Sequence, residues 1–222
     1  MNKKKGIERR EIFCASSLQI REAAEGAESR TIEGTAIVFG KRSEPLYEDS
    51  WMEIREVIAP EAVTRDLLDA STILMTLYHD NHRLLARSLR GKGTLSYDVR
   101  SDGVHFSFDA PETEDGRVAL EAIRRGDITG CSFAFSVDYS DRTAVERSSE
   151  TRDGKEYVLY TVKKMRAIHD FTLTPLPAYP QTATQNTRDI ENAYREEALE
   201  EKKASKAARE RKIAEILAIA GR

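Results

Sequence analysis

Apolar residues alternate with polar ones in many short segments of this chain. Such a period of two predicts β-strands that bury one face. The predicted strands are residues 12–21, 31–39, 53–58, 72–78, 84–89, 93–100, 104–109, 130–135, 156–163 and 165–173. Two helices are predicted, at 61–68 after Pro60 and at 116–125 before the Gly126-Asp127 turn. The charged stretch 137–155 has no apolar period and predicts a long exposed loop.

The composition divides the chain into three parts. Residues 1–10 are basic and predict a flexible N-terminus, and residues 11–184 form a β-rich domain. Residues 185–222 are rich in Glu, Lys, Arg and Ala, which predicts a charged helical tail. Only its far end carries an apolar stripe, formed by Ile213, Ile216, Leu217 and Ala220. Many short strands with two helices favour a mainly β fold with α, a small closed or nearly closed barrel, with a sandwich as the alternative.

Charge and cysteine content narrow the class of protein. The formal net charge of −3 argues against a general nucleic-acid binder, which is expected to be basic. No apolar run approaches the length that spans a membrane. The two cysteines, Cys14 and Cys131, make no disulfide framework, so a reduced cytoplasmic setting is expected. Charged residues follow the basic start where a signal peptide needs an apolar segment.

The strand after the second predicted helix offers a candidate nucleophile. Cys131, Phe133 and Phe135 fall on one face of this strand, and Ser132 and Ala134 fall on the other. The aromatic face is expected to pack into a core, which leaves the serine on a face with small side chains. Taken alone, a serine in a strand is most often structural.

A histidine and an acidic residue elsewhere in the chain could activate this serine. His79 ends an apolar strand at the start of a polar loop, where a rigid element can hold a side chain that still reaches solvent. Asp170 and His169 alternate along the last strand, so only one of them can point towards a common site. Together His79, Ser132 and Asp170 are a workable set for acyl transfer, although Asp170 could equally pair with Arg166 for structural reasons.

The other two histidines give weaker hypotheses. His105 lies inside a strand pattern and is expected to be structural. His79 and His82 have a spacing that could suggest a metal pair, but there is no clear third ligand. No metal is therefore expected, and a metal hydrolase is the third hypothesis.

Five segments stand out between about residue 31 and residue 184. They are Ile32-Glu33-Gly34-Thr35-Ala36 with Val38-Phe39-Gly40, Glu56-Val57-Ile58-Ala59-Pro60, Leu77-Tyr78-His79-Asp80 with Leu84-Leu85-Ala86-Arg87, residues 126–135, and residues 170–180. In this order they resemble the prohead proteases of tailed bacteriophages, a family related to the herpesvirus assembly proteases. Ala86 stands where a glycine is common in the family.

The resemblance implies a fold and roles for particular residues. The implied fold is the small β-barrel of the herpesvirus proteases, flanked by helices. His79 matches the base and Ser132 the nucleophile. Asp170 stands where relatives usually carry a glutamate as the third member. His169 is the alternative third member, because the herpesvirus relatives use a second histidine there.

The implied activity is that of a serine endopeptidase which cleaves scaffold or capsid-protein segments inside the immature head, in the cytoplasm of the bacterial host. Self-cleavage is expected to follow, and no cofactor is implied. The implied partners are the major capsid protein and scaffold segments, which the tail stripe could also dock onto. A homodimer rests on analogy with the herpesvirus enzymes alone. The rival hypothesis is a catalytically inactive, protease-like assembly component.

Overall fold

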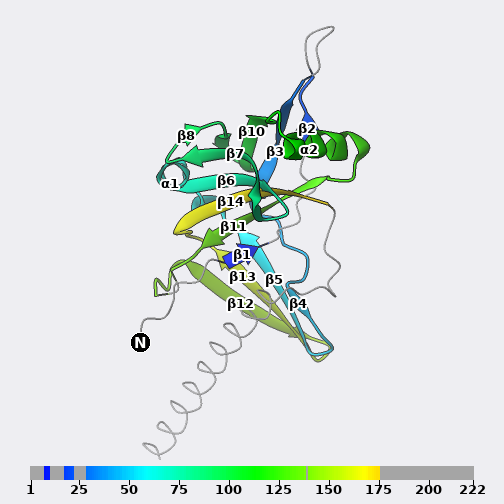
Figure 1. The fold of residues 1–222 in the computed structure, drawn as a ribbon. Helices are drawn as coiled ribbons and strands as arrows, with labels where there is room; N and C mark the ends of the chain where they lie inside the picture. The colour runs from blue at the N-terminus through cyan, green and yellow to red at the C-terminus, as the bar shows by residue number, and fades with distance from the viewer. Residues whose placement is uncertain (1–7, 11–17, 23–28, 139, 176–222) are drawn as a thin grey trace, which may run out of the picture. The chain divides into compact units, whose positions relative to one another are not determined.

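Three β-sheets and two α-helices make up the part of the chain that the computed structural model describes, which is residues 8–10, 18–22, 29–138 and 140–175 (Figure 1). The predicted tail helix at 185–222 lies outside these residues, as does most of the strand predicted at 12–21. Within the segment 1–10, which was predicted to be flexible, Glu8–Arg10 form strand β1. No helix among the described residues has both the length and the apolar composition needed to cross a bilayer.

Sheet A has six strands and contains the predicted nucleophile. Its strands, in spatial order, are β1 (Glu8–Arg10), β11 (Gly130–Ser136), β14 (Ala167–Thr174), β6 (Thr72–Leu77), β7 (Asp80–Leu89) and β8 (Lys92–Gly93). Neighbouring strands are antiparallel except β14 and β6, which run parallel.

Sheets B and C have four strands each. Sheet B contains β2 (Gln19–Ile20), β3 (Thr31–Val38), β10 (Gly103–Asp109) and β9 (Ser96–Arg100). Sheet C contains β12 (Val145–Arg152), β13 (Lys155–Val162), β5 (Met52–Ile58) and β4 (Tyr47–Glu48). Every pair in these two sheets is antiparallel except β13 and β5.

Both helices begin at a threonine cap. The Thr64 side chain accepts a hydrogen bond from the backbone N–H of Leu67 and starts α1 (Arg65–Ala70). Thr113 starts α2 (Glu114–Arg125) in the same way, and Gly126 ends it in the left-handed conformation, at φ 76°. The first predicted helix is therefore displaced, because Pro60–Ala62 form only a short 3₁₀ helix.

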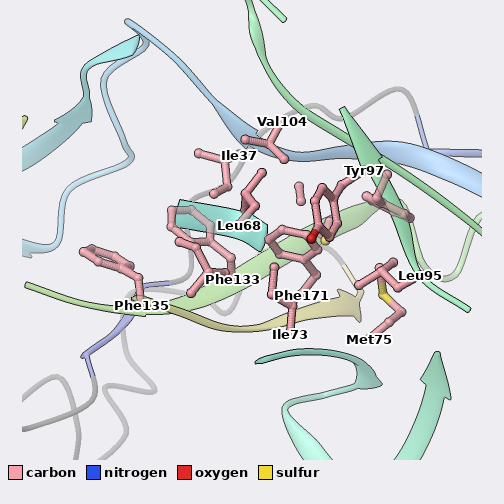
Figure 2. Close-up of a cluster of buried hydrophobic side chains, with 14 of the residues drawn as sticks. Ile37, Leu68, Ile73, Met75, Leu95, Tyr97, Val104, Phe133, Phe135 and Phe171 are labelled. Atoms are coloured by element: carbon pink, nitrogen blue, oxygen red, sulfur yellow. The ribbon is translucent and has the colours of Figure 1, made fainter. Parts of the chain in front are cut away.

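The main hydrophobic core contains aromatic side chains of sheets A and B. Phe133 and Phe135 of β11 stack with ring centroids 5.3 Å apart, and Phe171 of β14 lies 6.4 Å from Phe106 of β10. These four rings are buried. Figure 2 shows three of them, Phe133, Phe135 and Phe171, among Ile37 and other apolar side chains of the cluster. The prediction that the Phe133 face of this strand packs into a core is confirmed.

The mainly β class is confirmed, but the prediction of a closed barrel is wrong. The described strands form three sheets, and each sheet ends in edge strands, such as β1 and β8 of sheet A. The predicted loop at 137–155 is also wrong in part, because β12 (Val145–Arg152) lies inside it. Seven of its eight residues are exposed, so no apolar alternation marked it as a strand.

Candidate active site

The imidazole of His79 lies between the side chains of Ser132 and Asp170. Its Nε2 is 3.0 Å from Ser132 Oγ, and its Nδ1 is 2.7 Å from Asp170 Oδ1. The structure thus brings together the three side chains that the sequence analysis combined. A proton on Nδ1 is donated to the carboxylate, which leaves Nε2 to accept the hydroxyl proton of Ser132.

The pairing of three neighbouring strands creates this arrangement. Ser132 of β11 is paired with Thr172 of β14, which is paired with Thr76 of β6. Residues directly opposite each other in a sheet share a face, so these three side chains lie on the face away from the aromatic core. Asp170 is two residues before Thr172 on the same face, and His79 follows β6 after one intervening residue.

His79 is held in a tight two-residue turn between β6 and β7. Leu77 pairs with Asp80 across this turn, and the two residues between them have positive φ angles of 58° at Tyr78 and 55° at His79. The left-handed conformation costs a residue with a side chain about 1–2 kcal/mol. Turns of this kind usually contain Asn-Gly, so the Tyr-His sequence did not indicate one. The prediction for this segment was a polar loop.

Thr172 links this turn to the sheet. Its hydroxyl accepts a hydrogen bond from the backbone N–H of His79 at 2.8 Å and donates to the carbonyl of Thr76 at 3.1 Å. The Thr76 hydroxyl donates to the Thr172 hydroxyl oxygen at 3.0 Å. A second bond runs from the Tyr78 N–H to the carbonyl of Leu173, at 3.2 Å. Thr172 was not among the residues predicted for the site, although the alternation of β14 places it on the same face as Asp170.

Most of the site is buried, and His79 is its partly exposed member. Ser132 exposes 2% of its surface and Asp170 exposes 4%, while Thr76 and Thr172 are fully buried. A buried carboxylate is costly unless it is hydrogen-bonded, and here the His79 ring supplies a bond.

Comparison with known proteins identifies a family. A family model described as caudovirus prohead serine protease matches residues 16–196. The chain belongs to the caudovirus prohead serine protease family. A search of curated proteins and a search of solved structures each found no match. The family is therefore one of phage serine proteases, and His79, Ser132 and Asp170 all lie inside the matched segment.

His169, the alternative third member, does not join the cluster. Ala134 pairs with Asp170 and Phe135 pairs with Ile168, so His169 is the extra residue of a β-bulge. Its Nε2 is buried and has no hydrogen-bond partner among the described residues. Burial lowers the pKa of His169 below its usual value of 6.5; nearby Arg166 adds to this effect, and Asp170 opposes it.

The remaining candidates lie away from the site. His105 contacts Thr35 Oγ1 at 3.4 Å and Asp102 Oδ1 at 3.0 Å, as expected of a structural histidine. His82 is exposed, and its backbone N–H donates to Asp80. Among the described residues, no group of three or more His, Cys, Asp or Glu is placed to hold a metal ion. Arg166 is exposed, and its backbone N–H donates to the Ser136 carbonyl.

The Thr172 hydroxyl is expected to position His79. Thr172→Val leaves the His79 N–H without its acceptor, so the rate at which a serine-directed phosphonate labels Ser132 should fall about 10- to 100-fold. Thr172→Ser keeps the hydroxyl, so its labelling rate should stay close to that of the unchanged chain at every pH measured. Equal rates in the valine and serine variants would contradict a positioning role.

The depressed pKa of His169 should make stability depend on pH. The folded chain binds this proton less readily than the unfolded chain, so the free energy of unfolding should be highest above pH 6.5 and should fall as the pH decreases below it. Urea unfolding gives the free energy of unfolding at each pH between about 5 and 7.5. This free energy should change less with pH for His169→Gln than for the unchanged chain. The same pH dependence in His169→Gln and in the unchanged chain would contradict this assignment.

Proposed function

We propose that this chain is a serine endopeptidase of phage head maturation in which Ser132 is the nucleophile, His79 the base and Asp170 the residue that orients His79. The observation that carries the proposal is the pair of contacts made by the His79 ring, one from each nitrogen. Membership of a prohead serine protease family supports the same reaction class. A serine hydroxyl is a weak nucleophile near neutral pH, and an adjacent imidazole is its most common activator.

The proposed reaction proceeds in two halves. The Ser132 hydroxyl attacks the peptide carbonyl while His79 Nε2 takes its proton, and the resulting imidazolium is stabilised by the Asp170 carboxylate. His79 then gives this proton to the leaving amine, which breaks the C–N bond and leaves an acyl ester on Ser132. Water, deprotonated by His79, hydrolyses the ester and restores the enzyme.

The proposed substrates are segments of scaffold and major capsid protein inside the immature head, in the cytoplasm of the bacterial host. The family description, caudovirus prohead serine protease, supports this assignment. Self-cleavage is the second proposed activity. The rival function, an inactive protease-like assembly component, requires a serine that does not react, and the tests below separate the two.

Replacing the nucleophile should abolish self-cleavage. Mass spectrometry of the purified chain over time should show shortened products for the unchanged sequence and only the full length for Ser132→Ala, because loss of a catalytic serine typically lowers turnover about 10⁶-fold. A phosphonate should modify the unchanged chain stoichiometrically at Ser132. Similar shortening in the alanine variant would remove Ser132 from the mechanism.

The matched variant for this test is Ser136→Ala, which removes a hydroxyl from the same strand outside the proposed triad. It should shorten and label like the unchanged chain. A folded chain that neither shortens nor reacts with the phosphonate, even together with capsid and scaffold proteins, would favour the inactive assembly component.

Neighbouring substitutions on β14 should identify the third member. Asp170→Asn keeps the size of the side chain but favours the wrong histidine tautomer, so self-cleavage should slow by about 10⁴-fold. His169→Gln removes the alternative ring and should leave the rate within about threefold, since no described bond joins this residue to His79. The opposite ranking of the two rates would transfer the role to His169.

A further inference from the structure

Strand β12 is exposed along almost its whole length. It pairs with β13 through eight consecutive residue pairs with no shift of register. Among the described residues no strand pairs with its other edge, because β12 is the terminal strand of sheet C (Figure 1). Only Val145 is half-buried, and the other seven residues are exposed. A regular row of main-chain N–H and C=O groups therefore faces solvent.

The sequence of β12 has few of the features that usually protect such an edge. Edge strands avoid pairing with other chains by being very short, or by containing charged side chains (especially lysine), proline, inward-pointing charges or bulges. Of these, β12 has only charged side chains, and none of them is lysine. β12 has eight residues and contains no proline, glycine or lysine. Its two glutamates and two arginines balance, so charge repulsion does not keep a second strand away. This edge is open to pairing.

The arrangement of these charges suits a second copy of the same strand. Along a strand, the N–H and C=O groups of successive residues point to alternate edges. When two copies of β12 pair around a two-fold axis, odd-numbered residues must therefore lie opposite odd-numbered ones, and even-numbered residues opposite even-numbered ones. With the axis at Ser149, Glu146 lies opposite Arg152 and Ser148 lies opposite Glu150. This register contains two Glu146–Arg152 pairs and no like-charge pair.

The neighbouring registers are less favourable. With the axis at Ser148, Glu146 faces Glu150, and with the axis at Glu150 or Arg147 that residue faces its own copy. Like charges placed directly opposite are destabilising. An axis at Thr151 avoids this, but only three residues of the strand would then pair.

We propose that β12 pairs with β12 of a second copy around a two-fold axis at Ser149, which joins the two copies of sheet C into one continuous sheet. The seven residues from Glu146 to Arg152 of each strand take part. Glu146, Ser148, Glu150 and Arg152 share one face. The last three line an open hollow on sheet C together with Arg55, Tyr157 and neighbouring residues, so the hollows of the two copies meet at the axis.

The proposed interface is a single pair of strands with seven residues from each copy, so a reversible dimer is expected. Glu150 and Arg152 form an ion pair within the strand, with side chains that are 52% and 66% exposed. Glu146 also forms an exposed ion pair, with Lys163. Replacing these two partners by the Glu146–Arg152 pair across the axis costs little, because exposed ion pairs contribute little to stability. The proposal does not depend on the catalytic roles.

Charge reversal on the full-length chain tests the proposed register. Sedimentation velocity over the micromolar concentration range should show a monomer–dimer equilibrium. Glu146→Arg or Arg152→Glu alone puts like charges opposite in both symmetric pairs and should raise the Kd about tenfold or more. The double variant, which exchanges the two charges, should return the Kd to near that of the unchanged chain. A monomer at every concentration, or a double variant as weak as the singles, would overturn the proposal.

A cross-link tests the position of the axis. In a Cys14→Ser background, Ser149→Cys lies opposite its own copy and should form an intermolecular disulfide on mild oxidation. Ser148→Cys is the control, since its copy lies diagonally at about 7–8 Å, too far to bridge. Efficient cross-linking of the Ser148→Cys variant, and none of the Ser149→Cys variant, would refute this register.

Discussion

The side-by-side order of β11, β14 and β6 is the constraint on which the candidate site depends. These strands are far apart in the sequence, yet they place Ser132, Thr172 and Thr76 in one row across sheet A. The parallel pairing of β14 with β6 is decisive, because it brings the end of β6, and with it His79, over the row. An antiparallel pairing in its place would direct the end of β6 towards the opposite end of β14.

A polar cluster buried in this way remains stable only if its members satisfy one another. Asp170 and Ser132 are bonded by the two nitrogens of one ring, and the Thr172 hydroxyl bonds both the turn and β6. These bonds also hold the left-handed turn, whose strain would otherwise favour a looser loop. The same contacts that place the His79 ring therefore offset the cost of burying it.

Sequence alternation placed Ser132 on the face opposite the phenylalanines of its strand, which is the face away from the core. Along the last strand it showed only that either His169 or Asp170 can face a common site. The β-bulge at His169 and the contact of Asp170 with His79, which distinguish the two, are seen only in the structure. The turn at His79 and the role of Thr172 were beyond this reasoning. Both depend on the parallel β14–β6 pairing, which joins residues more than ninety positions apart, and no local pattern records such a contact.

Sequence alternation also failed at β12, which was predicted to be part of a loop. Alternation detects burial, whereas a strand is defined by main-chain pairing, and a strand exposed on both faces has pairing without burial. β12 is a strand because its main chain pairs with β13 in a hairpin, and not because it has an apolar face of its own. A segment of this kind gains little stability within one chain. Its regularity and balanced charge therefore suit the proposed pairing of the edge that no described strand covers.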